Sequence, residues 1–374
     1  MKSKTKIALI ILLFSSFIMF ASFGGQKVEW KGTIEKEDGI KVIKNPREPL
    51  YGEIKFELEE DLSIGREDED NYMFYRVRDI EVDNQGNIYV ADMSNCRVQK
   101  FDKNGVYLQT IGRLGQGPGE FERPTILQID DLTGKLYVKD STYSIEIFDD
   151  QGNHIEEIRL EDSPFDFKLD KNGNILGILT KITESGTFHT LCKINSEGEI
   201  EENYAEFPYT WIREQKGEAT FTFSLGHELS MLLSILDDKR FVYGYSKEYE
   251  LNVMDSEGQV LIRIKKDEPY PKFSEKEQRE YRRFKIPEYK PYFYGLFTDS
   301  EGRIYVQRNK TWQEENVEKE VDIFSKDGYY LYKTRLPQDT YIIENGYLYA
   351  LEVKDMEFVK RYKIKNWDRI TKGI

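Results

Sequence analysis

Three histidines are the residues best suited to acid–base or metal chemistry in this chain. His227 stands beside Glu228 and just before an apolar run that reads as an inner strand. The pair is not a zinc motif of the His-Glu-x-x-His type, because position 231 is Met. His154 follows a turn and should be exposed, whereas His189 lies within a strand pattern. The sequence contains no Gly-x-Ser-x-Gly nucleophile motif, so His227 and Glu228 are its catalytic or metal-binding candidates.

Aromatic and basic residues gather in three long insertions, at residues 207–227, 265–292 and 308–319. Such residues are common at binding hot spots, and long loops often carry function. The ligand-binding candidates are Trp211 and Arg213 in the first insertion, Arg282 and Arg283 in the second, and Arg308 and Trp312 in the third.

The second insertion is basic within an acidic chain. Segment 265–290 holds nine basic and six acidic residues, a net charge of +3. Ser274 and Glu277 form a capping box that predicts a helix, which Pro287 should end. Two interpretations stay open. One is a site for an anionic or sugar-like group or an acidic protein segment. The other is a helical lid that packs its aromatic side chains and exposes its charges.

Two series of tight turns indicate the elements that position these insertions. Asp, Asn and Gly supply the side-chain acceptors and positive φ angles that such turns require. The first series is 83–86, 131–134, 170–173, 237–240, 299–302 and 344–346, and the second is 102–105, 149–152, 195–198, 255–258 and 325–328. Two turns per unit predict four strands, a to d, and a period of 40 to 65 residues is typical of a β-propeller.

The number of turns predicts how the ring closes. The sequence has six a–b turns but only five c–d turns, because the sixth unit ends after its third strand. A lone strand pattern at Gly52–Leu58 and Leu62–Gly65 resembles a d strand and should complete the last blade. We therefore predict an all-β protein, a six-bladed β-propeller over residues 49–368, closed by this N-terminal strand. A short helical insertion should lie between blades 4 and 5.

The connections should divide between two faces of the ring. The a–b and c–d turns lie on one face, called here the turn face. The b–c loops and the d-to-a links lie on the other, called the link face. All three insertions fall on the link face, and we expect them to form one wall of the channel mouth near blades 4 and 5.

Blade 1 carries a resemblance to a known family. Residues 78–102, with Asp83-Asn-Gln-Gly86 and Ala91-Asp92, resemble an NHL repeat, and Gly112–Pro124 resembles the link between such repeats. The layout is similar to secreted bacterial six-bladed propellers. That resemblance implies the fold and ligand or protein binding. It implies no single reaction, because relatives include scaffolds as well as lyase-like and lactonase-like enzymes.

The N-terminal 25 residues read as a signal peptide, with Lys2, Lys4 and Lys6 before an apolar run. An uncleaved membrane anchor is the alternative. Residues 26–48 read as an N-terminal extension. The protein should be exported, to the periplasm or the extracellular space. Cys96 and Cys192 fall in non-adjacent blades and should stay free and buried.

Charge limits the partners. The formal net charge is −14, which repels the phosphate backbone and excludes nucleic acid as a partner. We expect an exported, non-enzymatic binding or scaffold module, monomeric, without a cofactor, that presents its link face to a protein or a small extracellular ligand. The alternative is a calcium-dependent lyase or lactonase-like enzyme with its site in the central channel, where His227 or Glu228 would assist proton transfer. A third reading is a cell-envelope structural part.

Overall fold

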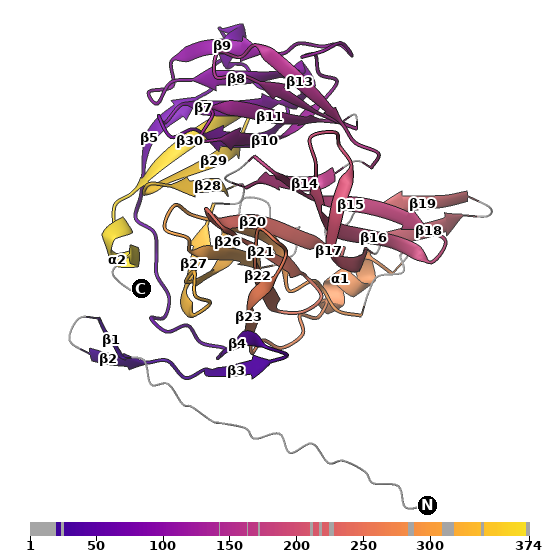
Figure 1. Cartoon of the computed structure of the whole chain (residues 1–374). Helices are drawn as coiled ribbons and strands as arrows, with labels where there is room; N and C mark the ends of the chain where they lie inside the picture. Colours follow the sequence, from indigo (N-terminus) through magenta and orange to yellow (C-terminus); the bar gives the residue numbers. More distant parts are fainter. Residues whose placement is uncertain are drawn as a thin grey trace, which may run out of the picture.

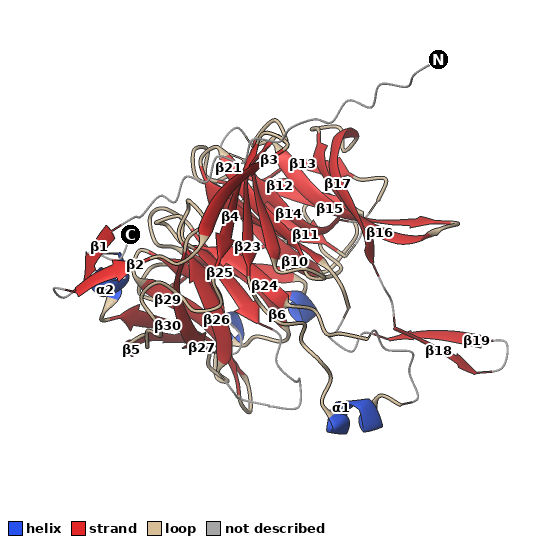
Figure 2. Ribbon diagram, turned by 90° about the horizontal axis from the view of Figure 1, so that it is seen from below, coloured by secondary structure: helices blue, strands red, loops and turns tan. Residues whose placement is uncertain are grey.

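Six antiparallel sheets stand around a central axis (Figures 1 and 2). The computed structural model describes residues 20–23, 26–141, 143–162, 164–170, 173–209, 212–216, 219–223, 228–282, 288–308, 318–337 and 340–371. The innermost strand of each sheet contacts the innermost strands of its two neighbours, and the sixth contacts the first. The predicted six-bladed β-propeller is confirmed.

The strands of the blades follow the predicted a-to-d order. Blade 1 is β6 (Val77–Val82), β7 (Ile88–Asp92), β8 (Arg97–Phe101) and β9 (Tyr107–Ile111), and blade 2 is β10 (Pro124–Asp130), β11 (Lys135–Asp140), β12 (Ser144–Phe148) and β13 (His154–Arg159). Blade 3 is β14 (Pro164–Leu169), β15 (Ile175–Thr183), β16 (Gly186–Ile194) and β17 (Ile200–Tyr209). The first four strands of blade 4 are β20 (Met231–Asp237), β21 (Arg240–Tyr245), β22 (Glu250–Asp255) and β23 (Val260–Lys266). Blade 5 is β24 (Phe293–Thr298), β25 (Ile304–Arg308), β26 (Lys319–Phe324) and β27 (Tyr330–Leu336). Blade 6 is β28 (Thr340–Glu344), β29 (Tyr347–Val353), β30 (Glu357–Ile364) and β5 (Leu58–Ile64).

The tight turns form because the acidic side chain at their first position accepts hydrogen bonds from backbone N–H groups that have no partner in the strands. Asp83 Oδ1 accepts hydrogen bonds from the backbone N–H of Gln85 and of Asn87, at 2.9 and 2.8 Å. Gly86 has φ +85°, a conformation that other L-residues rarely adopt. The c–d turn of blade 2 repeats the arrangement at Asp149. These turns keep the turn face short.

Strand β5 closes the ring by pairing antiparallel with β30. Arg361 binds Asp61 through two nitrogens, each 3.0 Å from a carboxylate oxygen. The closing strand begins at Leu58, later than the Gly52 start that the sequence suggested. The residues before it pair with blade 5 instead, where the N–H of Ile54 donates to the carbonyl of Lys333. The predicted strand pattern is therefore shared between two blades.

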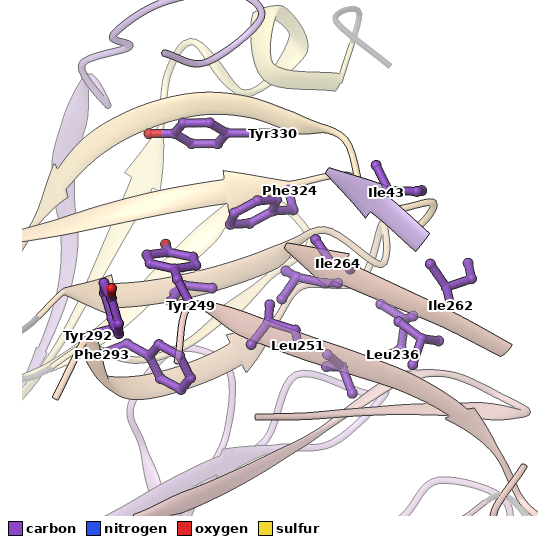
Figure 3. Close-up of a cluster of buried hydrophobic side chains, with 14 of the residues drawn as sticks. Ile43, Leu236, Tyr249, Leu251, Ile262, Ile264, Tyr292, Phe293, Phe324 and Tyr330 are labelled. Atoms are coloured by element: carbon purple, nitrogen blue, oxygen red, sulfur yellow. The ribbon is translucent and has the colours of Figure 1, made fainter. Parts of the chain in front are cut away.

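Residues 40–64 form an N-terminal strap across the outer edges of blades 4, 5 and 6. Strand β4 (Ile40–Asn45) pairs parallel with β23, and β3 (Thr33–Glu37) pairs with β4, so blade 4 has six strands. The chain then runs along β27 before it becomes β5. Ile43 of the strap enters the cluster between blades 4 and 5 that also contains Ile264 and Phe324 (Figure 3). The segment expected to be a separate extension thus adds strands to the propeller sheet.

Asn45 joins the strap to two blades. Its side-chain NH₂ donates to the carbonyls of Lys265 and Gly328, and its Oδ1 accepts from the N–H of Tyr330 and the indole N–H of Trp30. Asn45 is buried, so these bonds are shielded from water.

Six hydrophobic clusters fill the junctions between neighbouring blades. Cys96 and Cys192 are free and buried, as expected. Several described elements stand outside the blade sheets. They include the hairpin β18 (Ile212–Lys216) and β19 (Ala219–Phe223), helix α1 (Glu275–Glu280), helix α2 (Trp367–Thr371), and the 3-10 helices Asp70–Tyr72 and Met93–Asn95. A further hairpin, β1 (Phe20–Phe23) and β2 (Gln26–Glu29), lies within and just after the expected signal segment, most of which is outside the described residues. Within the described part, no helix is long and apolar enough to cross a bilayer.

Candidate functional site

The structure describes only part of the predicted site at blades 4 and 5. Hairpin β18–β19 and helix α1 project from the same side of the ring (Figure 2). Arg213 lies in β18. Trp211, His227, Arg283 and Trp312 lie outside the described residues.

Helix α1 is held in place by its capping box, an ion pair and a contact between two aromatic rings. Its capping box is present, with Ser274 and Glu277 bonded reciprocally. Lys290 Nζ lies 2.7 Å from a Glu277 carboxylate oxygen, and both side chains are buried. The buried rings of Phe273 and Tyr281 meet edge to face below the helix. The packed aromatic rings agree with the lid interpretation, whereas the buried Glu277–Lys290 pair differs from the exposed charges that it expects, and Arg282 is exposed just after the helix.

Arg308 takes part in a buried ionic network between blades 4 and 5. Its guanidinium lies 2.5 Å from Glu268, which also pairs with Lys266 at 2.8 Å. Asp322 is fully buried and accepts hydrogen bonds from Lys266 Nζ at 2.7 Å and from the hydroxyls of Tyr249 and Tyr330 at 2.5 Å each. Burial and the adjacent Asp322 carboxylate raise the pKa values of both tyrosines well above 10. Arg308 thus already has acidic partners within the protein, which makes it a poor candidate for binding a ligand.

The described histidines have structural partners. His189 is buried and stacked between Phe165 and Tyr209, with ring centroids 5.0 and 4.2 Å away, and burial lowers its pKa to about 4. A neutral, enclosed imidazole is poorly placed for proton transfer with a ligand. His154 is less exposed than expected, because its Nε2 lies 2.7 Å from the buried Glu146 carboxylate. Glu228 is half-buried. The burial of Tyr209, together with the nearby charge of Glu228, raises the pKa of Tyr209 to about 12.

Exposed aromatic rings mark the link face. Tyr75, Tyr143, Phe165 and Tyr270 are each half exposed or more. Tyr75 precedes β6, Tyr143 lies in the b–c loop of blade 2, Phe165 is near the start of β14, and Tyr270 follows β23. All four positions are link-face ends of strands or link-face loops. Sequence reasoning named none of the four. Tyr270 lies in the second insertion but was not among its candidates, and the other three are single aromatic residues in short loops, which give no pattern.

A hollow of about 340 Å³ opens on the link face beside blade 2. Its lining includes Gly115, Gly117, Tyr143, Ser144, Glu146, Glu157 and Arg159. Two of the carboxyl groups lie close to basic side chains: Arg159 Nε is 3.0 Å from Glu157, and His154 Nε2 is 2.7 Å from Glu146. Burial raises the pKa of Glu146 despite that partner. Four carboxyl groups, those of Glu120, Asp140, Glu146 and Glu157, and one guanidinium, that of Arg159, line this hollow beside one open aromatic ring. This acidic lining disfavours an anionic ligand.

The turn face has two polar hollows, one of them larger than the hollow on the link face. One, of about 430 Å³, lies between the turns of blades 1 and 2 and includes Asp83, Asp131 and Asp150 in its lining. The other, of about 320 Å³, lies between blades 6 and 1 and includes Glu344 and Arg361. Neither hollow has an exposed aromatic ring in its lining.

Charged side chains also come together on the inner strands of blades 1 to 3. Asp79 and Glu81 of β6 lie near Lys168 of β14, which is 3.5 Å from Asp166. Glu81 accepts a hydrogen bond from Gln128 at 2.9 Å. Burial raises the pKa values of Asp79 and Glu81, and Lys168 partly offsets this. Within the described ranges no group of three or more His, Cys, Asp or Glu side chains is arranged to hold a metal ion.

Comparisons with known proteins agree on the fold. A family model described as a 6-bladed beta-propeller, DUF5128, matches residues 64–210. No curated protein matches the chain. A solved structure from Bacteroides fragilis, of a protein described as exported, is 12% identical with a TM-score of 0.56 and covers 87% of this chain and 99% of its own. A DUF4221 member from Bacteroides vulgatus is 11% identical with a TM-score of 0.50 and covers 83% and 98%.

A Xanthomonas campestris gluconolactonase is 12% identical with a TM-score of 0.43 and covers 74% and 82%. It is too distant to bear on activity. The protein is a six-bladed β-propeller, and its resemblance to NHL repeats stays a prediction.

Proposed function

We propose that this protein is an exported, non-enzymatic binding propeller that engages a small extracellular ligand or a protein with its link face. The observation that carries the proposal is that the exposed aromatic side chains of the described residues, Tyr75, Tyr143, Phe165 and Tyr270, all lie on that face. Exposed aromatic rings of this kind supply contact area at low entropic cost and are enriched at binding hot spots.

Two further features support the link face. The long insertions lie there, and so does the hollow beside blade 2, whose lining contains Tyr143. The described basic groups near blades 4 and 5 largely have acidic partners, so the ligand we favour is neutral rather than anionic. Export rests on the signal-like first 25 residues, and the similarly folded Bacteroides fragilis protein is also described as exported.

Arrays of oligosaccharides and peptides test the proposal. The full chain should bind a defined set of probes, and Tyr143→Ala and Tyr270→Ala should each weaken that binding about tenfold. The melting temperature should stay nearly unchanged, because both side chains are exposed. Trp211→Ala, Arg283→Ala and Trp312→Ala extend the test to the insertions.

Leu132→Ala is the matched control. Leu132 is exposed on the turn face, so its removal should leave probe binding intact. The proposal fails if the wild-type chain binds no probe, or if the control loses binding as much as the tyrosine variants do. It also fails if the tyrosine variants melt far below wild type.

The calcium-dependent enzyme makes a different prediction. A resident calcium ion would raise the melting temperature by mass action, and a chelator would lower it. A large shift between the two conditions would favour the enzyme over the binding module.

A further inference from the structure

The glycine-rich link between blades 1 and 2, at Gly112–Pro124, forms one wall of the hollow beside blade 2. Four of the residues that line the hollow, from Gly115 to Glu120, belong to this link. The others belong to blade 2 and to the residue that follows its last strand. The link therefore does more than connect two blades, because it shapes a cavity on the face that carries the exposed aromatic rings.

Backbone N–H groups of the link orient three carboxylates around the hollow. The bonds run from Gly117 to Glu120 at 3.0 Å, from Gly119 to Glu146 at 3.3 Å and from Glu122 to Asp140 at 3.1 Å. Gly115 leaves the room that Glu120 needs, since a Cβ atom at this position would lie 1.9 Å from Glu120 Oε2. N–H groups are dipoles without net charge, so they fix the carboxylates in place without neutralising them.

Negative charge exceeds positive charge in the lining. Against its four carboxyl groups stands the guanidinium of Arg159, which already binds Glu157 through two bonds of 3.0 and 3.1 Å. Arg113 pairs with Glu120, but its side chain is 81% exposed and lies outside the lining. Burial raises the pKa of the Glu146 carboxyl, and the charge of Glu157 acts in the same direction. A hollow lined mainly by one sign of charge concentrates its field and attracts the opposite sign, here a cation.

An open aromatic ring in the same lining indicates which kind of cation fits. The side chain of Tyr143 is 59% exposed and borders the hollow. The face of an aromatic ring attracts ammonium groups, and its apolar surface covers the methylene groups beside them. A cavity of about 340 Å³ also has room for an organic group rather than for a bare ion alone. Within the described ranges, no His, Cys, Asp or Glu side chains are grouped to hold a metal ion.

We propose that the hollow beside blade 2 binds an alkylammonium group, as carried by a lysine side chain of a peptide or by a free amine. The carboxylates attract the ammonium group, and the ring of Tyr143 packs on it and on its methylene groups. The inference rests on the link-face binding function proposed above and extends it, because a ligand that is neutral elsewhere carries one positive group here.

Isothermal titration of the full chain with three end-blocked peptides tests the charge. They have the sequence Gly-Gly-X-Gly-Gly, with lysine, norleucine or glutamate at X. Norleucine keeps the carbon chain of lysine and lacks its amine. The lysine peptide should bind at least about tenfold more tightly than the norleucine peptide, and the glutamate peptide should not bind. Salt at about 0.5 M should weaken the binding of the lysine peptide, because it screens the attraction. Butylammonium chloride distinguishes the two sources: binding equal to that of the peptide indicates a free amine, and weaker binding indicates a peptide.

Substitutions locate the binding in the hollow. Glu157→Gln should weaken it about tenfold, because Arg159 then lies unpaired beside the ammonium group. Glu156→Gln is the matched control: it removes the same charge from the exposed neighbour on β13, outside the lining, and should change nothing. Tyr143→Ala should weaken binding about threefold, whereas Tyr143→Phe keeps the ring and should bind like wild type. Gly115→Ala should also weaken binding, because it displaces Glu120 without changing any charge.

The peptide comparison uses the wild-type chain and does not depend on how any variant folds. The proposal is overturned if the lysine and norleucine peptides bind alike, or if calcium chloride binds more tightly than the lysine peptide does. It is equally overturned if Glu156→Gln loses as much affinity as Glu157→Gln. If the chain binds other probes through its exposed tyrosines but not the lysine peptide, the link-face function stands and this inference alone fails.

Discussion

Two carboxyl groups at the turn-face ends of inner strands have raised pKa values although neither side chain is fully buried. Glu344 is the last residue of β28, and burial raises its pKa to about 7, helped by the nearby charges of Asp131 and Asp299. Asp131 is affected in the same direction by burial and by Asp83. These groups lack the cationic partners that Asp322 has, so they make stability depend on pH.

Glu344→Gln should remove part of that dependence. The carboxyl of Glu344 binds its proton more tightly in the folded state than in the unfolded state, where its pKa is near 4.5. Its contribution is therefore fully present below pH 4.5 and is lost as the pH rises through about 7. Thermal melts of both proteins at pH 4.5 and pH 8 check this. The variant should gain melting temperature over wild type at pH 8 and little at pH 4.5, and an equal gain at both values would contradict the pKa argument.

At the scale of elements, the N-terminal strap covers strand edges that would otherwise be unpaired. Strand β4 protects β23, residues 50–54 protect β27, and β5 completes blade 6. Its side chains also fill core positions, as Ile43 shows between blades 4 and 5 (Figure 3). The single side chain of Asn45 bonds three backbone groups of blades 4 and 5, the carbonyls of Lys265 and Gly328 and the N–H of Tyr330.

Asn45→Ala should lower the free energy of unfolding by about 3 kcal/mol, because it leaves buried N–H and C=O groups without partners. Urea denaturation measures the change. Asn104→Ala is the matched control: Asn104 is exposed in a c–d turn, and its replacement should cost within about 0.5 kcal/mol. A similar small effect at Asn45 would mean that the strap is not held at this point.

The whole molecule is a closed ring, in which the N-terminal strand β5 joins the three strands of the last repeat to form blade 6. Closure removes the unpaired edge of β30 and places Ile64 in the cluster between blades 6 and 1. The charged pair Arg361 and Asp61 reinforces the same junction. Stability should therefore depend on the N-terminal strand more than its short length suggests.

Truncation separates the strap from what precedes it. A chain without residues 1–28 should melt like the full chain, because Trp30 is the first buried residue among those whose burial the structure describes. A chain without residues 1–64 should lose its cooperative melting transition, since three outer edges become exposed together. Calorimetry of both truncated chains decides the matter, and a cooperative transition in the shorter one would show that closure by β5 is dispensable.

The sequence by itself determined the repeat and therefore the fold. Turn residues such as Asp83 and Gly86 act locally, through hydrogen bonds to the next few residues and through backbone conformation, so their spacing predicts strands and blades. The capping box of Ser274 and Glu277 predicted α1 for the same reason. Ring closure could be predicted because the last repeat lacks its d strand and a single strand pattern precedes the first repeat.

Only the tertiary structure decided which polar groups have partners. Arg308 reads as a ligand-binding residue in sequence, yet it lies against Glu268, 40 positions away. The course of residues 50–54 along blade 5, and the exposure of Tyr143 or Leu108, likewise depend on which distant strands lie beside them. Pairing and burial are set by non-local contacts, and a local sequence pattern cannot specify those.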